Sequence, residues 1–333
     1  MTERKKKPAK TVTAVGIVLA ALIVIFAGFT IVSHAVYHRS DMATAAELLF
    51  RVQGTKKKFS NPKECAEYIE QRRSAGEYVL TAKLKSDISE RSVNGSSVYV
   101  LSKSEQPEYL VLYLHGGAYI NDASASHWSF CDKLVQKANA EVVFPIYPLT
   151  PNHIWDETFD LITAVYQEML ESANAPMIIM GDSAGGGLAA AFCEYIDGLG
   201  LPQPDELILF SPWMDISMSN PAAADYEAAD PMLSAYGLIE MGKCWAGDLD
   251  LHDYRVSPIF GDLSMLQNVY LFVGTREIFF PDVTDFYTML RNHGITAELY
   301  IGEGMNHVYP LYPIPEAEEA MKQIQLILQK AGG

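Results

Sequence analysis

Cysteine is scarce in this sequence, and the four residues that occur are widely separated. Cys65, Cys131, Cys193 and Cys244 include no C-x-x-C pair, which disfavours a zinc ribbon. The chain also lacks an internal repeat, a low-complexity tract and a long Gly/Ser linker, so neither a solenoid nor a disordered protein is indicated. We expect Cys193 to be a free thiol in the core, because it lies in an apolar helical segment.

Positive charge is also in short supply. The 333 residues contain 25 Lys and Arg against 41 Asp and Glu, a formal net charge of −16. Residues 1–10 hold five of the basic residues and one acid, so the rest of the chain is more acidic still. An acidic body disfavours nucleic acid as a partner, and it disfavours a globular domain lying flat on anionic lipid.

Charged side chains are absent from Thr11–Val32, which is 22 residues long and therefore able to cross a hydrocarbon core of about 30 Å as a helix. A buried helix and a cleaved signal peptide are the alternatives. Ser33-His34-Ala35 resembles a small-x-small cleavage site, but the apolar stretch exceeds the roughly 7–15 residues of a usual signal core. We expect residues 11–33 to be a transmembrane signal-anchor. Residues 1–10 then stay cytoplasmic and the rest lies outside; secretion after cleavage is the alternative.

Beyond residue 95, short apolar runs alternate with helical patterns, which predicts an α/β fold with a mostly parallel sheet and helices on both faces. We expect an additional antiparallel edge strand over Val98–Leu101. The expected parallel strands are Tyr109–Leu114, Val142–Ile146, Met177–Met180, Leu207–Phe210, Val269–Val273 and Ala297–Ile301. The expected helices are Trp128–Ala138, Glu157–Ser172, Gly187–Ile196, Val283–His293 and Glu316–Gln329.

Two segments do not fit this alternation. Residues 36–76 are helical and polar, and residues 213–265 are rich in Met, Ala, Asp and Trp. Insertions of this kind usually cover an active site rather than extend a sheet. We therefore expect residues 36–76 to form N-terminal cap helices, and residues 77–333 to form the α/β domain with a cap insertion at about 213–265.

The motif Gly181-Asp182-Ser183-Ala184-Gly185-Gly186 lies between an apolar run and a helix of small residues. A nucleophilic serine must project above the sheet on a tight, strained turn, and flanking glycines let neighbouring backbone approach. A plain Gly-rich turn or a phosphate cradle is the alternative. Because no Lys follows, as a Walker loop would require, we predict that Ser183 is a nucleophile.

A second motif, His115-Gly116-Gly117-Ala118-Tyr119, follows the strand that ends at Leu114. Small residues expose backbone N–H groups, and an oxyanion needs such donors, each worth roughly 3 kcal/mol. The residue after the nucleophile, Ala184, is expected to supply a further donor. His115 and Gly116 are expected to order the loop. His115 is a poorer base than His307, because it precedes the nucleophile in the chain.

His307 follows the last predicted strand, where the base of a Ser–acid–His order is expected. The acid should follow the penultimate strand, and Glu277 and Asp282 both lie there. Glu277 comes four residues after the strand, where its carboxylate can reach the imidazole. Asp282 looks more like the N-cap of the helix that opens at Val283. We favour Glu277 and keep Asp282 as the alternative.

Together these motifs resemble those of the hormone-sensitive-lipase-like α/β-hydrolases, a group of microbial esterases and lipases. The resemblance covers about residues 78–331. It includes the HGG and GDSAGG motifs, and it extends to Tyr147-Pro148-Leu149-Thr150-Pro151 and to an S-P-x-x-D turn at Ser211-Pro212-Trp213-Met214-Asp215.

This resemblance implies an α/β-hydrolase with a helical cap, and oxyanion donors at Gly117, Ala118 and Ala184. The chain departs from the family pattern at Ala118, where a third Gly is commoner, and at Glu277, where Asp is usual. Since the donor is a backbone N–H, Ala should serve. Tyr119 and Trp213 either line the substrate pocket or pack in the core.

The expected activity is that of a membrane-anchored serine carboxylesterase acting on short- to medium-chain esters through an acyl-enzyme on Ser183. No metal or organic cofactor is required. The expected partners are an ester substrate and, through the N-terminal helix, a membrane. An acyltransferase or peptidase on the same fold, a non-catalytic binding protein and a membrane-anchored scaffold are the alternatives.

Overall fold

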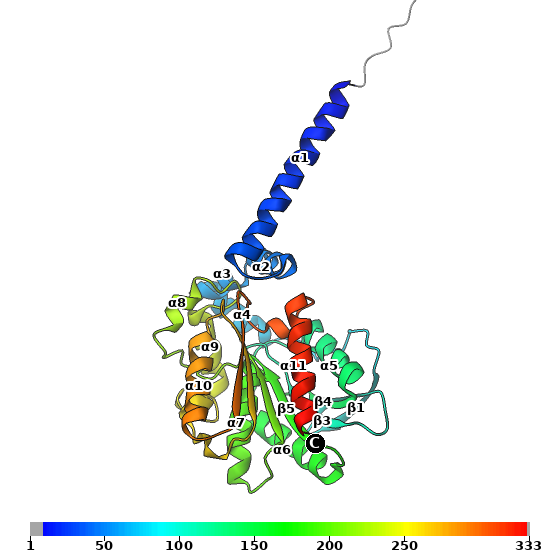
Figure 1. Ribbon diagram of the computed structural model, residues 1–333. Coiled ribbons are helices and arrows are strands. Elements are labelled where there is room, and N and C mark those ends of the chain that lie inside the picture. The colour runs from blue at the N-terminus through cyan, green and yellow to red at the C-terminus, as the bar shows by residue number, and fades with distance from the viewer. Residues whose placement is uncertain (1–8, 332–333) are drawn as a thin grey trace, which may run out of the picture.

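The computed structural model describes the backbone of residues 9–331 and the side chains of residues 20–331 (Figure 1). Within this range the strands form one eight-stranded sheet in the order β1-β2-β4-β3-β5-β6-β7-β8. β1 pairs with β2 and β2 with β4 in antiparallel fashion, and all the other pairs are parallel. The strands are β1 (Asp87–Val93), β2 (Ser96–Ser102), β3 (Tyr109–Leu114), β4 (Ala140–Pro145), β5 (Met177–Asp182), β6 (Glu206–Phe210), β7 (Val269–Gly274) and β8 (Ala297–Gly302).

Helices cover both faces of the sheet. α5 (Ala125–Ala138) and α11 (Pro315–Ala331) pack into one hydrophobic cluster, on one face. α6 (Trp155–Ser172), α7 (Ala184–Gly198) and α10 (Phe280–Asn292) pack into a second cluster, on the other (Figure 1). The central strands are buried on both sides and accordingly read as unbroken apolar runs. The predicted α/β class and mostly parallel sheet are therefore confirmed.

Strand β1 was not predicted from the sequence. Its residues Asp-Ile-Ser-Glu-Arg-Ser-Val carry little apolar signal, and most of them are exposed. It lies at the edge of the sheet, where only one side of its backbone is paired. The predicted antiparallel strand Val98–Leu101 is present within β2, one position further in.

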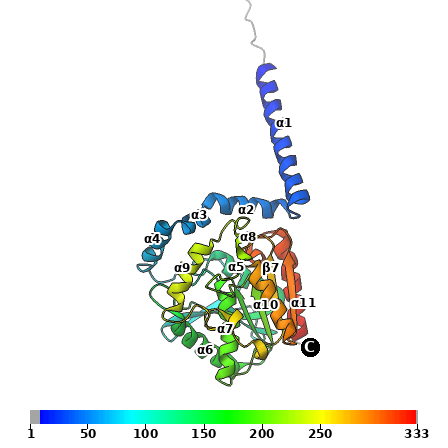
Figure 2. The ribbon, with the colours of Figure 1, turned by 90° about the vertical axis from the view of Figure 1, so that its left-hand side faces the viewer.

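Helices from two distant segments lie above one end of the sheet (Figure 2). Residues 36–76 contain α2 (Asp41–Gln53), α3 (Thr55–Ser60) and α4 (Pro62–Arg72), and residues 213–265 contain α8 (Ala223–Glu227) and α9 (Ala235–Ala246). α3 lies so close to α9 that a Cβ at Gly237 would collide with Phe59. The two segments thus pack directly on each other, and together they form the cap.

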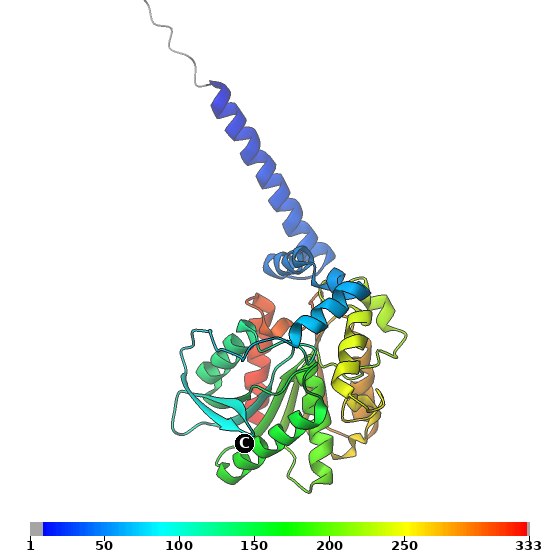
Figure 3. The ribbon, with the colours of Figure 1, turned by 180° about the vertical axis from the view of Figure 1, so that it is seen from behind.

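Helix α1 (Ala9–Ile31) continues into a short π-helix, Val32–Val36, and extends away from the body (Figures 1 and 3). Across the described residues, no helix taken singly has the length and apolar character needed to span a membrane. Ala20–Val36 and Asp41–Gln53 together have the required length and apolar character, but the two helices are bent by 99° relative to each other. The predicted span over residues 11–33 is therefore not supported by this test, and most of the predicted basic segment 1–10 lies outside the described residues.

Candidate active site

Ser183 lies at the sharp turn between β5 and α7. Its backbone adopts φ 53° and ψ −121°, a strained conformation for an L-residue, and its N–H donates to the carbonyl oxygen of Phe210 at 2.9 Å. A Cβ at Gly185 would collide with the carbonyl oxygens of Leu114 and His115. The glycine therefore allows the turn to press against β3, which is the local reason for a G-x-S-x-G sequence here.

The Ser183 hydroxyl is hydrogen-bonded to an imidazole, which is hydrogen-bonded in turn to a carboxylate. His307 Nδ1 donates to Glu277 Oε2 at 2.6 Å, which leaves Nε2 to accept from Ser183 Oγ at 2.9 Å. Glu277 follows β7 and His307 follows β8, so both side chains come from the same edge of the sheet as Ser183. All three residues are buried, and the structure thus brings together the residues predicted for the triad.

The second oxygen of Glu277 is fixed as well. Oε1 accepts from Ser211 Oγ at 2.7 Å and from Gly274 N at 2.6 Å. Ser211 Oγ in turn accepts from the backbone N–H of Val308, the residue after His307, at 2.9 Å. Ser211 was not predicted as a site residue, although it opens the S-P-x-x-D turn. One hydroxyl therefore orients the acid and holds the neighbouring histidine loop.

Two opposing effects act on the pKa of His307. Burial of the ring lowers the pKa, whereas the hydrogen bond and the negative charge of Glu277, together with the charge of Asp230, raise it. The net result is a pKa above the usual value of a histidine. A base of raised pKa accepts the serine proton more readily, and it stays neutral only above that pKa.

Asp282 occupies a different environment. Helix α10 begins at Phe280, so Asp282 lies in its first turn, and the predicted N-cap role is wrong. Its side chain is buried, and burial raises its pKa to about 7. Within the described residues Oδ2 has no hydrogen-bond partner. Glu277 thus accepts the hydrogen bond from His307. Asp282 is close to Glu277 in the sequence, but its buried side chain makes no hydrogen bond to His307.

The loop Gly116–Tyr119 packs against the serine turn. Gly117 has φ 131° and Ala118 φ 54°, and a Cβ at Gly116 would collide with Asp182 and touch Ser183 Cβ. In the described part of the chain, the backbone N–H groups of Gly117, Ala118 and Ala184 donate to no acceptor. Three free donors therefore lie beside Ser183.

The carboxylate of Asp182, the residue before Ser183, connects the serine turn to the Gly116–Tyr119 loop. It accepts from Gly116 N at 3.1 Å, from the Tyr113 hydroxyl at 2.7 Å and from His127 Nε2 at 3.1 Å. Burial opposes the charge of Asp182, but the interactions with His127 and the two other donors lower its pKa. Sequence reasoning missed Tyr113 and His127, since nothing in the local pattern marks them.

His115 does not face the serine. It is fully buried, its Nδ1 donates to the carbonyl oxygen of Gly116 at 2.8 Å, and its ring stacks on Tyr147 with 4.3 Å between centroids. Burial lowers its pKa to about 4, so the ring is neutral at physiological pH. Its contacts are those of a residue that orders the loop.

A cavity of about 230 Å³ opens over Ser183 and His307. The cap contributes apolar side chains to its walls, including Phe59 from α3 and Leu238 and Met241 from α9, and the loops after β3 and β8 contribute others. Tyr119 and Trp213 are not among the lining residues. Both are buried in the core, where the ring of Tyr119 stacks on Trp213 and Trp245. Pocket lining was therefore the wrong alternative for these two residues.

The cysteines lie outside the cavity and are free thiols, and Cys193 is buried as predicted. Among the side chains that the structure describes, no group of three or more His, Cys, Asp or Glu residues is arranged to hold a metal ion.

Residues 111–311 match a family model described as alpha/beta hydrolase fold. An esterase from Acinetobacter venetianus is 29% identical over 237 residues, which is 70% of this chain and 77% of that protein. The solved structure of a candidate esterase from Staphylococcus aureus superimposes with a TM-score of 0.76 at 34% identity, covering 80% of this chain and 92% of that one. A hormone-sensitive-lipase homologue from a metagenome library, 24% identical, shares the fold with a TM-score of 0.75 over 87% and 99% of the two chains.

Proposed function

Because the chain belongs to the alpha/beta hydrolase fold family, as an esterase/lipase-type member that hydrolyses carboxylic esters, we propose that Ser183 is its nucleophile. The observation that carries this proposal is the unbroken series of hydrogen bonds from Ser183 Oγ through His307 to Glu277. In this proposal His307 is the base and Glu277 is the acid that orients it.

The mechanism follows from this geometry. His307 Nε2 takes the hydroxyl proton as Ser183 Oγ attacks the ester carbonyl, and the N–H groups of Gly117, Ala118 and Ala184 stabilise the oxyanion. The protonated His307 then gives its proton to the departing alkoxide, leaving an acyl group on Ser183. Water, deprotonated by His307, attacks this acyl-enzyme and releases the acid, which restores the serine hydroxyl.

We propose short- to medium-chain esters as substrates. The cavity volume of about 230 Å³ is smaller than the roughly 300–1,000 Å³ that is usual for sites of larger ligands. Its lining includes apolar side chains of the cap and no Lys or Arg that would bind an acidic substrate. A small acyl chain therefore fits better than a long one or than a charged peptide.

We further propose that the N-terminal segment tethers the enzyme to a membrane, with the catalytic domain outside. In support, α1 extends from the body, and the described apolar side chains along it are exposed, Ile23 by 68% and Val24 by 71% (Figure 3). Burying such a surface in lipid is favourable, whereas leaving it in water is costly. The basic residues at 1–10 favour retention of that end in the cytoplasm.

The test of the nucleophile uses the full-length chain and p-nitrophenyl esters from acetate to octanoate. Wild type is expected to prefer the shorter esters, and Ser183→Ala is expected to lose about 10⁴-fold or more in kcat. Labelling by a fluorophosphonate reports the same serine independently. Retention of activity and of labelling in Ser183→Ala would refute the proposal.

The tether has its own test. Membranes from cells expressing the full-length chain are washed with carbonate and then with detergent, and compared with those from cells expressing a variant lacking residues 1–35. Full-length protein is expected to need detergent for release, and external protease is expected to digest its catalytic domain. Release of the full-length chain by carbonate alone contradicts the tether without touching the esterase assignment.

A further inference from the structure

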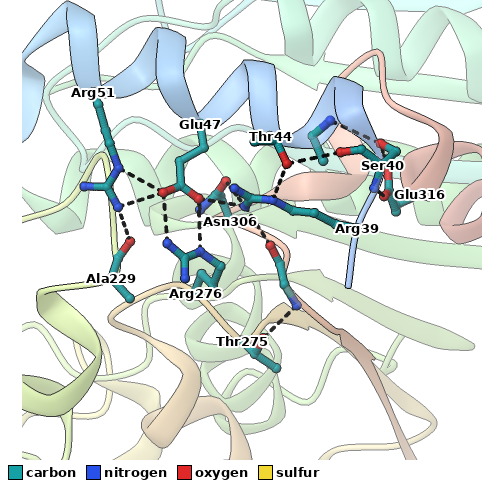
Figure 4. Close-up of polar contacts among 12 residues, drawn as sticks. Arg39, Ser40, Thr44, Glu47, Arg51, Ala229, Thr275, Arg276, Asn306 and Glu316 are labelled. Atoms are coloured by element: carbon teal, nitrogen blue, oxygen red, sulfur yellow. Dashed lines mark hydrogen bonds and ion pairs between the residues drawn. The ribbon is translucent and has the colours of Figure 1, made fainter. Parts of the chain in front are cut away.

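Helix α2 carries a buried carboxylate outside the catalytic cavity, at Glu47. The side chain of Glu47 is only 5% exposed, and three guanidinium groups surround it (Figure 4). Arg39 Nη1 lies 2.6 Å from Oε2, Arg51 Nη2 lies 2.7 Å from Oε1, and Arg276 donates to both oxygens at 2.9 and 3.0 Å. Burial alone would raise the pKa of Glu47, but these hydrogen bonds lower it to about 2, so the group is ionised at any physiological pH.

The partners of Glu47 lie directly beside two residues of the proposed triad. Arg276 precedes Glu277 in the loop after β7, and Asn306 precedes His307 in the loop after β8. Asn306 Nδ2 donates to Glu47 Oε2 at 3.3 Å. One carboxylate therefore holds the loop of the acid and the loop of the base together from outside the sheet.

Arg39 strengthens the same link. Its Nη1 also donates to the carbonyl oxygen of Gly304 at 2.9 Å and to Asn306 Oδ1 at 3.4 Å. Gly304 has φ 69°, and a Cβ there would collide with the carbonyl oxygen of Tyr37. The guanidinium groups of Arg39 and Arg276 each lie 4.7 Å from the centroid of the Tyr37 ring. The loop after β8, which carries His307, therefore packs closely against Tyr37 and Arg39 of the N-terminal segment.

Arg51 connects Glu47 to a third loop, the one in the cap insertion that contains Ala229. Its Nη2 donates to the carbonyl oxygen of Ala229 at 3.0 Å, in the cap insertion. The next residue, Asp230, is buried and accepts from the backbone N–H of Ile278, which follows Glu277, at 3.0 Å. The cluster around Glu47 therefore contacts the cap insertion and both loops of the proposed triad.

We propose that Glu47 is a positioning residue for catalysis, which fixes through Arg276 and Asn306 the loops that present Glu277 and His307. This inference rests on the proposed function. A buried ion cluster adds little net stability over apolar packing, because desolvation offsets the attraction between the charges. Its geometry, however, restrains both loops to one arrangement, and the 2.6 Å hydrogen bond between Glu277 and His307 depends on that arrangement.

The test compares Glu47→Gln with Glu316→Gln in the full-length chain. Glu316 also holds the N-terminal segment, since it accepts from Ser40 N at 2.6 Å and from Ser40 Oγ at 2.9 Å, but these contacts do not involve the triad loops. Glu47→Gln is expected to lower kcat for p-nitrophenyl butyrate about tenfold or more, with KM changed less than about twofold. Glu316→Gln is expected to leave both unchanged.

The pH profile separates positioning from loss of stability. Removing the Glu47 charge leaves the positive charge of Arg276, the residue before Glu277, uncompensated, and it loosens Glu277; both changes are expected to lower the pKa of His307. The acid limb of kcat/KM in Glu47→Gln is therefore expected to move to lower pH by about half a unit. Glu47→Asp keeps the charge and is expected to restore the position of the limb.

Three outcomes overturn the inference: an unchanged kcat and pH limb in Glu47→Gln, the same losses in Glu316→Gln, or a limb that stays displaced in Glu47→Asp. If Glu47→Gln does not fold, Arg276→Lys replaces it, because Lys cannot bridge both carboxylate oxygens, and an unchanged kcat there is equally decisive. Ser183→Ala is run alongside. Full activity in that variant refutes the proposed function, whereas its inactivity beside a fully active Glu47→Gln refutes only the positioning role.

Discussion

The two sides of the cavity are built in contrasting ways. On the sheet side, the carboxylates of Asp182 and Glu277 near Ser183 each accept from three donors. On the cap side, Phe59, Leu238 and Met241 offer only apolar surface, and they come from helices far apart in the chain. The sheet side therefore fixes which reaction is possible, whereas the cap decides which substrates fit. Substitutions on each side test this division.

The largest effect is expected from the acid on the sheet side. In Glu277→Gln, an amide replaces the acceptor that orients His307, so kcat should fall about 10³- to 10⁴-fold. The acid limb of kcat/KM is expected to lie above the usual histidine pKa in wild type, and it should move to lower pH in the variant, because Glu277 contributes most to raising the pKa of His307. Initial rates on p-nitrophenyl butyrate from pH 5 to 9 measure both.

Asp282→Asn is the matched control for this prediction. Its side chain is buried in the first turn of α10 and does not hydrogen-bond to the imidazole, so kcat at pH 7 should change less than about threefold. A larger loss in Asp282→Asn than in Glu277→Gln would reverse the assignment of the acid, provided that both variants have the circular dichroism of wild type.

Sequence patterns located the sheet side well, for a physical reason. Strands buried on both faces are unbroken apolar runs, and a nucleophile that projects from a strained turn needs small residues at fixed spacing. Local sequence patterns therefore locate Ser183 and the Gly116–Tyr119 loop. The polar edge strand β1 gave no such signal.

Partners that meet only in three dimensions were harder to find. Spacing after β7 favoured Glu277 but left Asp282 as an alternative, since the choice depends on which carboxylate reaches His307. Ser211 and His127 come from other elements and support the site through side-chain hydrogen bonds that no local pattern marks. Local patterns could not identify the residues of the cap walls, because Phe59 contacts Gly237 of α9, which lies 178 positions later in the chain.

The second prediction concerns the oxyanion loop. Ala118 has φ 54°, which alanine tolerates poorly and a β-branched residue hardly at all. Ala118→Val should shift this backbone and misdirect its N–H, with a loss of about 10²-fold in kcat. Ala118→Gly adopts positive φ freely and should keep kcat within about threefold. A Val variant as active as the Gly variant would remove Ala118 N–H from the proposed donors.

The third prediction concerns stability on the sheet side. Burial raises the pKa of Asp282 to about 7, from about 4 in the unfolded chain. The unfolded state therefore loses this proton at lower pH than the folded state, so wild-type stability falls as pH rises from about 4 to about 7. Asp282→Asn has no such proton, so its free energy of unfolding relative to wild type should rise between pH 5 and 7.5 by about 2 kcal/mol. Urea unfolding at the two pH values measures it, and a constant difference would mean that Asp282 is ionised in the folded state.

The smallest effect is expected on the cap side. Leu238 lines the cavity and is 4% exposed, so Leu238→Ala should enlarge the acyl site without touching the hydrogen bonds around Ser183. Each added methylene that finds apolar contact contributes about 0.8 kcal/mol, so new contact for about two methylenes should raise the ratio of kcat/KM for hexanoate to that for acetate about tenfold. The acetate rate itself should stay within about threefold of wild type, because the sheet side is unaltered.

Leu290→Ala provides the matched control, since Leu290 is a fully buried leucine of α10 that does not line the cavity. It should lose comparable stability, about 2–5 kcal/mol, yet keep the wild-type ratio of hexanoate to acetate. If both variants shift the ratio alike, general loosening of the fold sets chain-length preference. If only Leu238→Ala lowers the acetate rate strongly, then the cap also takes part in positioning the ester for attack, and the division between the two sides of the cavity does not hold.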